Sequence, residues 1–118
     1  MDLTHTILHE NRWTWGKTIH VVSCYGEAIV EMSFADDNAG VCYISGLSVT
    51  QPIRNKGVAT KLMQFCESYC MSHHIFRIDL NSVLEQFVMD FYHKLGYVDI
   101  KESDGVMMMY KLLPNRAI

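Results

Sequence analysis

The segment 47–63 constrains the fold more than any other part of the chain. It reads LSVTQPIRNKGVATKLM. Apolar and polar residues alternate up to Val49, which predicts a strand, and Pro52 ends it because proline lacks an amide hydrogen and disfavours helix before it. A helix begins beside Gly57. Since the first turn of a helix has unpaired amides and partial positive charge, this strand, turn and helix predict an anion site that suits a diphosphate.

Two patterns predict helices. Apolar side chains recur at three- and four-residue intervals after the turn, which predicts a helix from residue 58 to about residue 72. Ser82 and Glu85 have the spacing of a capping box, in which the hydroxyl accepts a hydrogen bond from a first-turn amide and the carboxylate reaches back. We therefore expect a second helix over 83–95. It ends at Gly96, because glycine readily adopts the left-handed conformation of a helix stop.

Alternating apolar and β-branched residues predict strands, which lie at 17–25, 28–34, 41–49, 75–80, 97–100 and 106–113. Short turns join the first three into an antiparallel meander, and the strand–helix–strand unit predicts a right-handed crossover between parallel strands. The expected fold class is α/β with a mixed sheet, in the order strand, strand, strand, helix, strand, helix, strand, strand. Residues 1–16 have no clean period and form either an N-terminal arm or a short first strand.

Length and composition limit the classes of function. A chain of 118 residues is expected to form one domain, 1–118, and 49% apolar with 19% charged residues is typical of a soluble globular protein. A net charge of −3 argues against nucleic acid as a partner, and no apolar run reaches the length of a membrane span. The cysteines have neither disulfide-framework nor zinc-finger spacing, so we expect reduced core thiols, no metal and a cytoplasmic location.

Two motifs in this order resemble a known family. The pattern Arg54-x-x-Gly57-x-Ala59 after a strand is similar to the acyl-CoA-binding signature of the GCN5-related N-acetyltransferase (GNAT) superfamily. Later in the chain, Tyr92 and Gly96 stand where that family has a tyrosine and a glycine at the end of its next helix. The resemblance covers most of the chain, so we expect the GNAT-like fold.

The resemblance also implies how acetyl-CoA binds. The strands at 41–49 and 75–81 would splay apart to admit the pantetheine arm, and amides at the start of the helix would hold the diphosphate. A substrate amine would attack the thioester directly in a ternary complex, with Tyr92 as the general acid that protonates the leaving thiolate; without the resemblance, Tyr92 reads as a core tyrosine. The residues implied to contact acetyl-CoA are Leu47, Ser48, Val49, Arg54, Asn55, Lys56, Gly57, Val58, Ala59, Thr60, Glu85 and Tyr92.

Two positions depart from the family pattern. Glu85 stands where family members often have an asparagine that touches the pantetheine, so it either contacts the cofactor or caps the helix. The strand before the signature lacks the glutamate that often deprotonates the amine. We take Glu31 on the neighbouring strand as a tentative base. The alternatives are Asp79, His20, or a water held by Ser45 or Ser48.

The N-terminal region is shorter than in the family, where a strand and two helices precede the meander and wall the acceptor site. The acceptor side is therefore expected to be open, covered by Trp13 and Trp15, or closed by a second subunit in a homodimer. Two functions fit the sequence. The first is an acetyl-CoA-dependent N-acetyltransferase acting on an unidentified amine. The alternative is a non-catalytic acyl-CoA-binding or protein-interaction module on the same fold.

Overall fold

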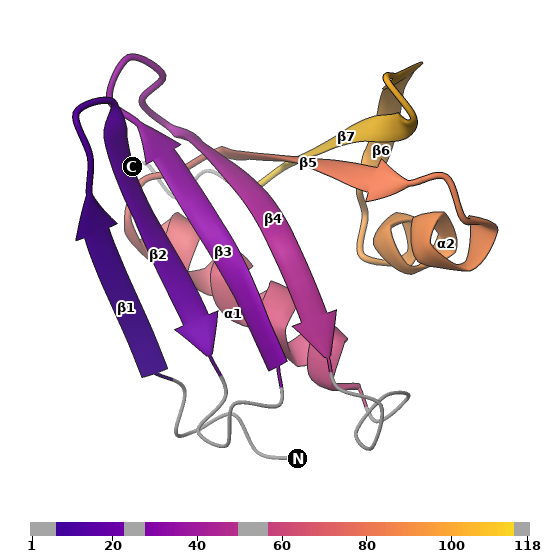
Figure 1. Ribbon diagram of the computed structural model, residues 1–118, viewed down its shortest axis with the longest axis horizontal. Coiled ribbons are helices and arrows are strands. Elements are labelled where there is room, and N and C mark those ends of the chain that lie inside the picture. Colours follow the sequence, from indigo (N-terminus) through magenta and orange to yellow (C-terminus); the bar gives the residue numbers. More distant parts are fainter. Residues whose placement is uncertain (1–6, 23–27, 50–56, 115–118) are drawn as a thin grey trace.

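A computed structural model describes residues 7–22, 28–49 and 57–114 of the chain. These residues form one mixed sheet and two helices (Figure 1). The strands follow one another across the sheet in the order β1-β2-β3-β4-β5-β7-β6. The elements are β1 (Ile7–Arg12), β2 (Gly16–Val22), β3 (Ala28–Ala35), β4 (Val41–Val49), α1 (Val58–Ser72), β5 (Arg77–Val83), α2 (Gln86–Lys94), β6 (Val98–Ser103) and β7 (Val106–Leu112).

Strand pairing changes direction at β4. The strands β1 to β4 form an antiparallel meander, whereas β4 and β5 are parallel neighbours joined through α1. The last strand, β7, pairs antiparallel with both β5 and β6. Figure 1 shows α1 crossing behind the meander. It shows α2 after the end of β5, to one side of the meander. The parallel pair agrees with the predicted crossover, since a hairpin can join only antiparallel strands.

The hydrophobic core lies between α1 and one face of the sheet. Successive strand residues point to opposite faces, so alternate residues of β2 and β3, and of β4 as far as Ile44, are buried on the side of α1. The helix contributes side chains spaced at three and four residues, as its apolar period requires. The fully buried members of this core include Val21, Val30, Met32, Cys42, Leu62, Met63, Cys66, Cys70 and Ile78.

The opposite face of β1 to β4 is covered by neither of the described helices. Ile29 and Tyr43 point to this face and are 36% and 39% exposed. Trp13 reaches onto it, because its indole Nε1 donates a hydrogen bond to Thr18 Oγ1 at 3.0 Å. We call this surface, whose polar row is formed by His9, His20, Glu31 and Ser45, the open face.

Most predicted elements are confirmed, with one alternative decided and one prediction wrong. Residues 7–12 form β1, so the short first strand is the correct alternative for that part of the N-terminal region. The capping box is wrong. Ser82 lies in β5, where its Oγ donates to the carbonyl of Val83 at 2.8 Å, and Glu85 makes no side-chain cap hydrogen bond. The reason is non-local, since β5 pairs with β7 as far as Val83 and α2 therefore starts three residues later than predicted.

β4 and β5 separate after a short paired stretch. Their register runs from Val41 and Arg77 to Ile44 and Leu80, and the remaining described residues of the two strands are not paired with each other. Figure 1 shows the two strands diverging from that point. The predicted splay is therefore present, and it opens a gap between the two parts of the sheet.

A β-bulge lies at the start of this gap. The two-residue step from Ile29 to Glu31 on β3 is matched by a three-residue step from Ser48 to Ser45 on β4. Gly46 takes up the extra residue with a φ of 65°, in the left-handed region that glycine enters without steric cost. Since one added residue exchanges the two faces of a strand, side chains after the bulge point the opposite way from those expected by alternation.

A three-part contact fixes the end of α2 to α1 and β7. Lys111 Nζ lies 2.9 Å from Glu67 Oε1 and donates to the carbonyl oxygen of Leu95 at 2.6 Å. Tyr97 donates its hydroxyl hydrogen to Glu67 Oε2 at 3.1 Å. Burial, followed by the nearby Glu67 carboxylate, raises the pKa of Tyr97 well above its usual range, so the phenol remains a donor.

We expect Lys111→Met to lower the free energy of unfolding by about 2 kcal/mol, because it leaves the largely buried Glu67 carboxylate without its cation. Arg12→Met is the matched control. Arg12 pairs with Asp36 at the surface, with both side chains more than half exposed, so its loss should cost less than about 1 kcal/mol. Urea denaturation of the three proteins measures the difference. Equal losses of stability in the two variants would contradict a stabilising role for the contact between Lys111 and Glu67.

Gly46→Ala should also destabilise the fold, by about 1–2 kcal/mol, because a φ of 65° is unfavourable for a residue with a Cβ. Steric overlap is not the cause, since a Cβ at Gly46 would meet no atom within 4 Å. Ser48→Ala, an exposed position on the same strand, serves as the control in the denaturation series. Unchanged stability in Gly46→Ala would mean that the bulge is not fixed by the glycine.

Candidate functional site

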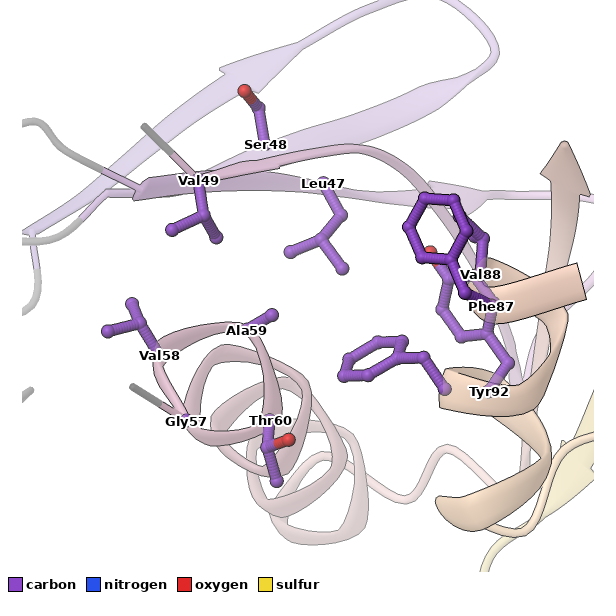
Figure 2. A pocket seen from close by; sticks show the side chains of 11 residues that line it. Leu47, Ser48, Val49, Gly57, Val58, Ala59, Thr60, Phe87, Val88 and Tyr92 are labelled. Atoms are coloured by element: carbon purple, nitrogen blue, oxygen red, sulfur yellow. The ribbon is translucent and has the colours of Figure 1, made fainter. Parts of the chain in front are cut away.

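A cavity of about 510 Å³ lies between the end of β4, the first turn of α1 and the helix α2. Figure 2 shows the side chains of Leu47 and Val49 pointing into this space while Ser48 points away. The bulge explains this arrangement, because it turns Leu47 and Val49 toward the helices. The lining residues are Leu47, Ser48, Val49, Gly57, Val58, Ala59, Thr60, Phe87, Val88, Phe91 and Tyr92.

The first turn of α1 forms one end of the cavity. Its N-cap is Gly57, which has a φ of 76°, makes no side-chain cap hydrogen bond and leaves open space where a Cβ would stand. The turn carries no acidic residue. Three consecutive lining residues, Val58 to Thr60, belong to this turn. A helix start whose N-cap residue has no side chain, with small residues that allow close approach to the backbone, suits a phosphate-containing anion.

Tyr92 lies at the α2 side of the cavity. Figure 2 shows its side chain extending from α2 toward β4. The ring is held by edge contacts with Phe91 and Tyr97, at centroid distances of 5.1 Å and 5.9 Å. Only 8% of the residue is exposed, and this burial raises the pKa of the Tyr92 phenol. Because the hydroxyl stays protonated at neutral pH, Tyr92 can donate a proton to a group in the cavity.

The structure brings together most of the residues predicted to contact acetyl-CoA, since those of β4, of the first turn of α1 and Tyr92 all line one cavity. Glu85 is not among them. It stands exposed at the N-cap of α2, and its side chain neither lines the cavity nor caps the helix. Arg54, Asn55 and Lys56 lie outside the described residues.

Three lining residues were assigned to the site only by the structure. Phe87, Val88 and Phe91 come from α2, and their spacing of one, three and four residues places them on one apolar side of the helix. That pattern does not distinguish a core contact from a cavity wall. Phe87 is 72% exposed despite its size, which identifies it as part of the cavity rim.

The candidate bases separate into two groups on the open face. His20 Nε2 lies 2.6 Å from Glu31 Oε2, and Ser45 Oγ donates to Glu31 Oε1 at 3.4 Å. Asp79 accepts a hydrogen bond from Arg77 Nε at 2.6 Å instead. The structure therefore places Glu31, His20 and Ser45 in one cluster and holds Asp79 in a separate ion pair.

The buried thiols do not form a second site. Cys42, Cys66 and Cys70 are completely buried, and burial raises the pKa of Cys66 to about 12, which keeps its thiol protonated and unreactive. Among the described residues, no group of three or more His, Cys, Asp or Glu side chains could hold a metal ion. None of the described helices combines the length and the hydropathy that a membrane span requires.

The sequence and the fold were compared with known proteins. A family model described as the acetyltransferase (GNAT) family matches residues 5–97. No curated protein matches the sequence. Among solved structures, the chain is similar to a GNAT-family acetyltransferase from Staphylococcus aureus, at 17% identity and a TM-score of 0.69, over 86% of this chain and 70% of that one.

Two further structures extend the comparison. The PaiA N-acetyltransferase of Thermoplasma acidophilum, in complex with coenzyme A, has 14% identity and a TM-score of 0.70, over 80% of this chain and 59% of that one. A chimera of the Vibrio cholerae spermidine N-acetyltransferase has 17% identity and a TM-score of 0.65, over 84% of this chain and 68% of that one. These likenesses show the fold, and the family match spans most of the chain. The chain therefore belongs to the acetyltransferase (GNAT) family.

Proposed function

We propose that this protein transfers the acetyl group of acetyl-CoA to an amine by direct attack in a ternary complex. The observation that carries the proposal is one cavity with the glycine N-cap of α1 at one end and Tyr92 at the other, beside the gap between β4 and β5. The anion site matches the diphosphate, and the proton donor matches the thioester. The apolar channel between them matches the pantetheine arm.

The cavity walls supply the proposed contacts. Amides of the first turn of α1, from Val58 to Thr60, would bind the diphosphate, and Arg54 and Lys56 would add positive charge. The arm would run along the backbone of residues 47–49 as an added strand, with its apolar atoms against the phenylalanines of α2. Bulge amides near Gly46 would donate to the thioester oxygen, on which negative charge develops during attack.

Tyr92 is the proposed acid. The amine nitrogen forms a bond to the thioester carbon, the carbon–sulfur bond breaks, and the Tyr92 hydroxyl gives its proton to the leaving thiolate. The ordinary pKa of a thiol, about 8.5, lies below that of a phenol, about 10, and burial raises the pKa of Tyr92, so the transfer is uphill and Tyr92 regains its proton from solvent afterwards. The amine must lose one proton in the same reaction.

A non-catalytic acyl-CoA-binding module is the second candidate. The open face favours it, because no described helix walls the side from which an acceptor would approach. The names of the similar structures do not identify the acceptor for this chain. Binding of acetyl-CoA is common to both candidates, so only turnover separates them.

Gly57→Trp should weaken acetyl-CoA binding on the order of 100-fold, because the indole would occupy the space in front of the α1 amides. Gly105→Trp is the matched control. Both glycines have positive φ, 76° and 82°, and open space where a Cβ would stand, but Gly105 lies in the β6–β7 turn away from the cavity. Isothermal titration calorimetry measures both. Equal affinity in the two variants would contradict the proposed diphosphate site.

Tyr92→Phe should lower kcat for acetyl transfer by about 10²- to 10⁴-fold with little change in the Kd for acetyl-CoA, because only the proton donor is lost. Tyr110→Phe, on β7, is the control and should keep kcat within about twofold. The assay follows thiol release across a panel of alkylamines. A Tyr92→Phe enzyme with the wild-type kcat would remove Tyr92 from the mechanism.

A further inference from the structure

The open face carries a row of polar side chains that the cavity does not use. Register pairs place His9 opposite His20, His20 opposite Glu31, and Glu31 opposite Ser45, across the four strands of the meander. All four side chains point away from α1. Each strand thus contributes one member to a continuous row that ends at β4.

Within this row, three groups are in contact. Glu31 Oε1 accepts the hydrogen bond of Ser45 Oγ at 3.4 Å, while Glu31 Oε2 lies 2.6 Å from His20 Nε2. The side chains of His20 and Glu31 are 35% and 30% exposed. The carboxylate is therefore held between two strands with one oxygen directed to Ser45 and a route for proton exchange with solvent.

Ser45 lies where this row meets the gap. It follows Ile44, the last β4 residue paired with β5, and precedes the bulge at Gly46. The bulge turns Leu47 into the cavity, whereas Ser45 faces the open side. A nucleophile entering the gap from the open face would thus meet the Ser45 hydroxyl before the cavity.

We propose that Ser45 and Glu31, positioned by His20, accept the proton of the attacking amine, which enters from the open face. This inference rests on the proposed acetyl transfer. Before the attack, the ammonium form of the amine gives one proton to Ser45 Oγ while the Ser45 hydroxyl proton passes to Glu31 Oε1. The free amine then bonds to the thioester carbon, and its nitrogen loses a second proton to solvent as the amide forms. Glu31 releases the proton that it received from Ser45 to solvent. His20 is a positioning residue, because its contact with Oε2 directs Oε1 toward Ser45.

Other charged groups do not compete for this role. His9 on β1 lies opposite His20, and the strand β2 separates it from Glu31 on β3. Asp79 on β5 is engaged by Arg77, whose guanidinium carbon lies 4.6 Å from the centre of the Tyr110 ring. The residues directly opposite Glu31 on the two adjacent strands are thus His20 and Ser45.

The test measures kcat/KM for an alkylamine, of pKa about 10.4, in wild type and Glu31→Gln from about pH 7 to about pH 9. At the lower pH, Glu31→Gln should lose about 10²- to 10³-fold. The loss should shrink as the pH rises, because the fraction of free amine grows about tenfold per pH unit and free amine needs no base. A merely structural role for Glu31 would give a loss that does not change with pH.

Partner variants complete the test. Ser45→Ala should show the same pH-dependent loss and Ser45→Thr should recover activity, since threonine keeps the hydroxyl. His20→Ala should lose more than His20→Gln, which retains a donor for Glu31. Asp79→Asn is the matched carboxylate control and should stay within about twofold of wild type.

The outcomes separate this inference from the proposed function. A wild type that acetylates no amine would overturn both. An active wild type matched by Glu31→Gln at every pH would overturn the relay and leave acetyl transfer standing, as would a pH-dependent loss in Asp79→Asn alone. Acetyl-CoA affinity is measured in each variant, and an unchanged Kd confirms that the fold and cofactor site are intact.

Discussion

The point at which β4 and β5 stop pairing is the constraint on which the rest of the structure depends. Backbone pairing ends at Ile44 and Leu80, and the bulge at Gly46 bends the free part of β4 away. The gap gives an extended ligand access to the backbone of β4, which a fully paired parallel sheet would bury. It also places the first turn of α1 and the tyrosine of α2 at two ends of one cavity.

The gap requires support from the parts of the fold around it. α1 buries its apolar face against β3 and β4, and its largely buried Glu67 connects it to Tyr97 and Lys111. This contact fixes the chain just after α2, and thereby the ring of Tyr92. The same sheet separates two chemical environments, an apolar cavity on the helix side and a polar row on the open face.

Local patterns predicted much of this architecture. The limits of β4 and α1 agree with the prediction, because the alternation of β4, the turn at Gly57 and the helical period of α1 are local patterns that each span a few residues. The capping box failed because Ser82 belongs to a strand that pairs with distant β7. The bulge was missed, although a glycine inside a predicted strand is its usual signal. The contact of Glu31 with His20 and Ser45 depends on strand register, which the sequence does not state.

The proposed function requires acetyl-CoA to bind in the gap, with its diphosphate at α1 and its thioester at the bulge. The most direct measurement is a two-dimensional NMR titration of the backbone amides with acetyl-CoA. We predict large shifts at Gly46, Leu47 and the first turn of α1, with little change in the β6–β7 turn. An absence of shifts, or shifts centred on that turn, would contradict this mode of binding.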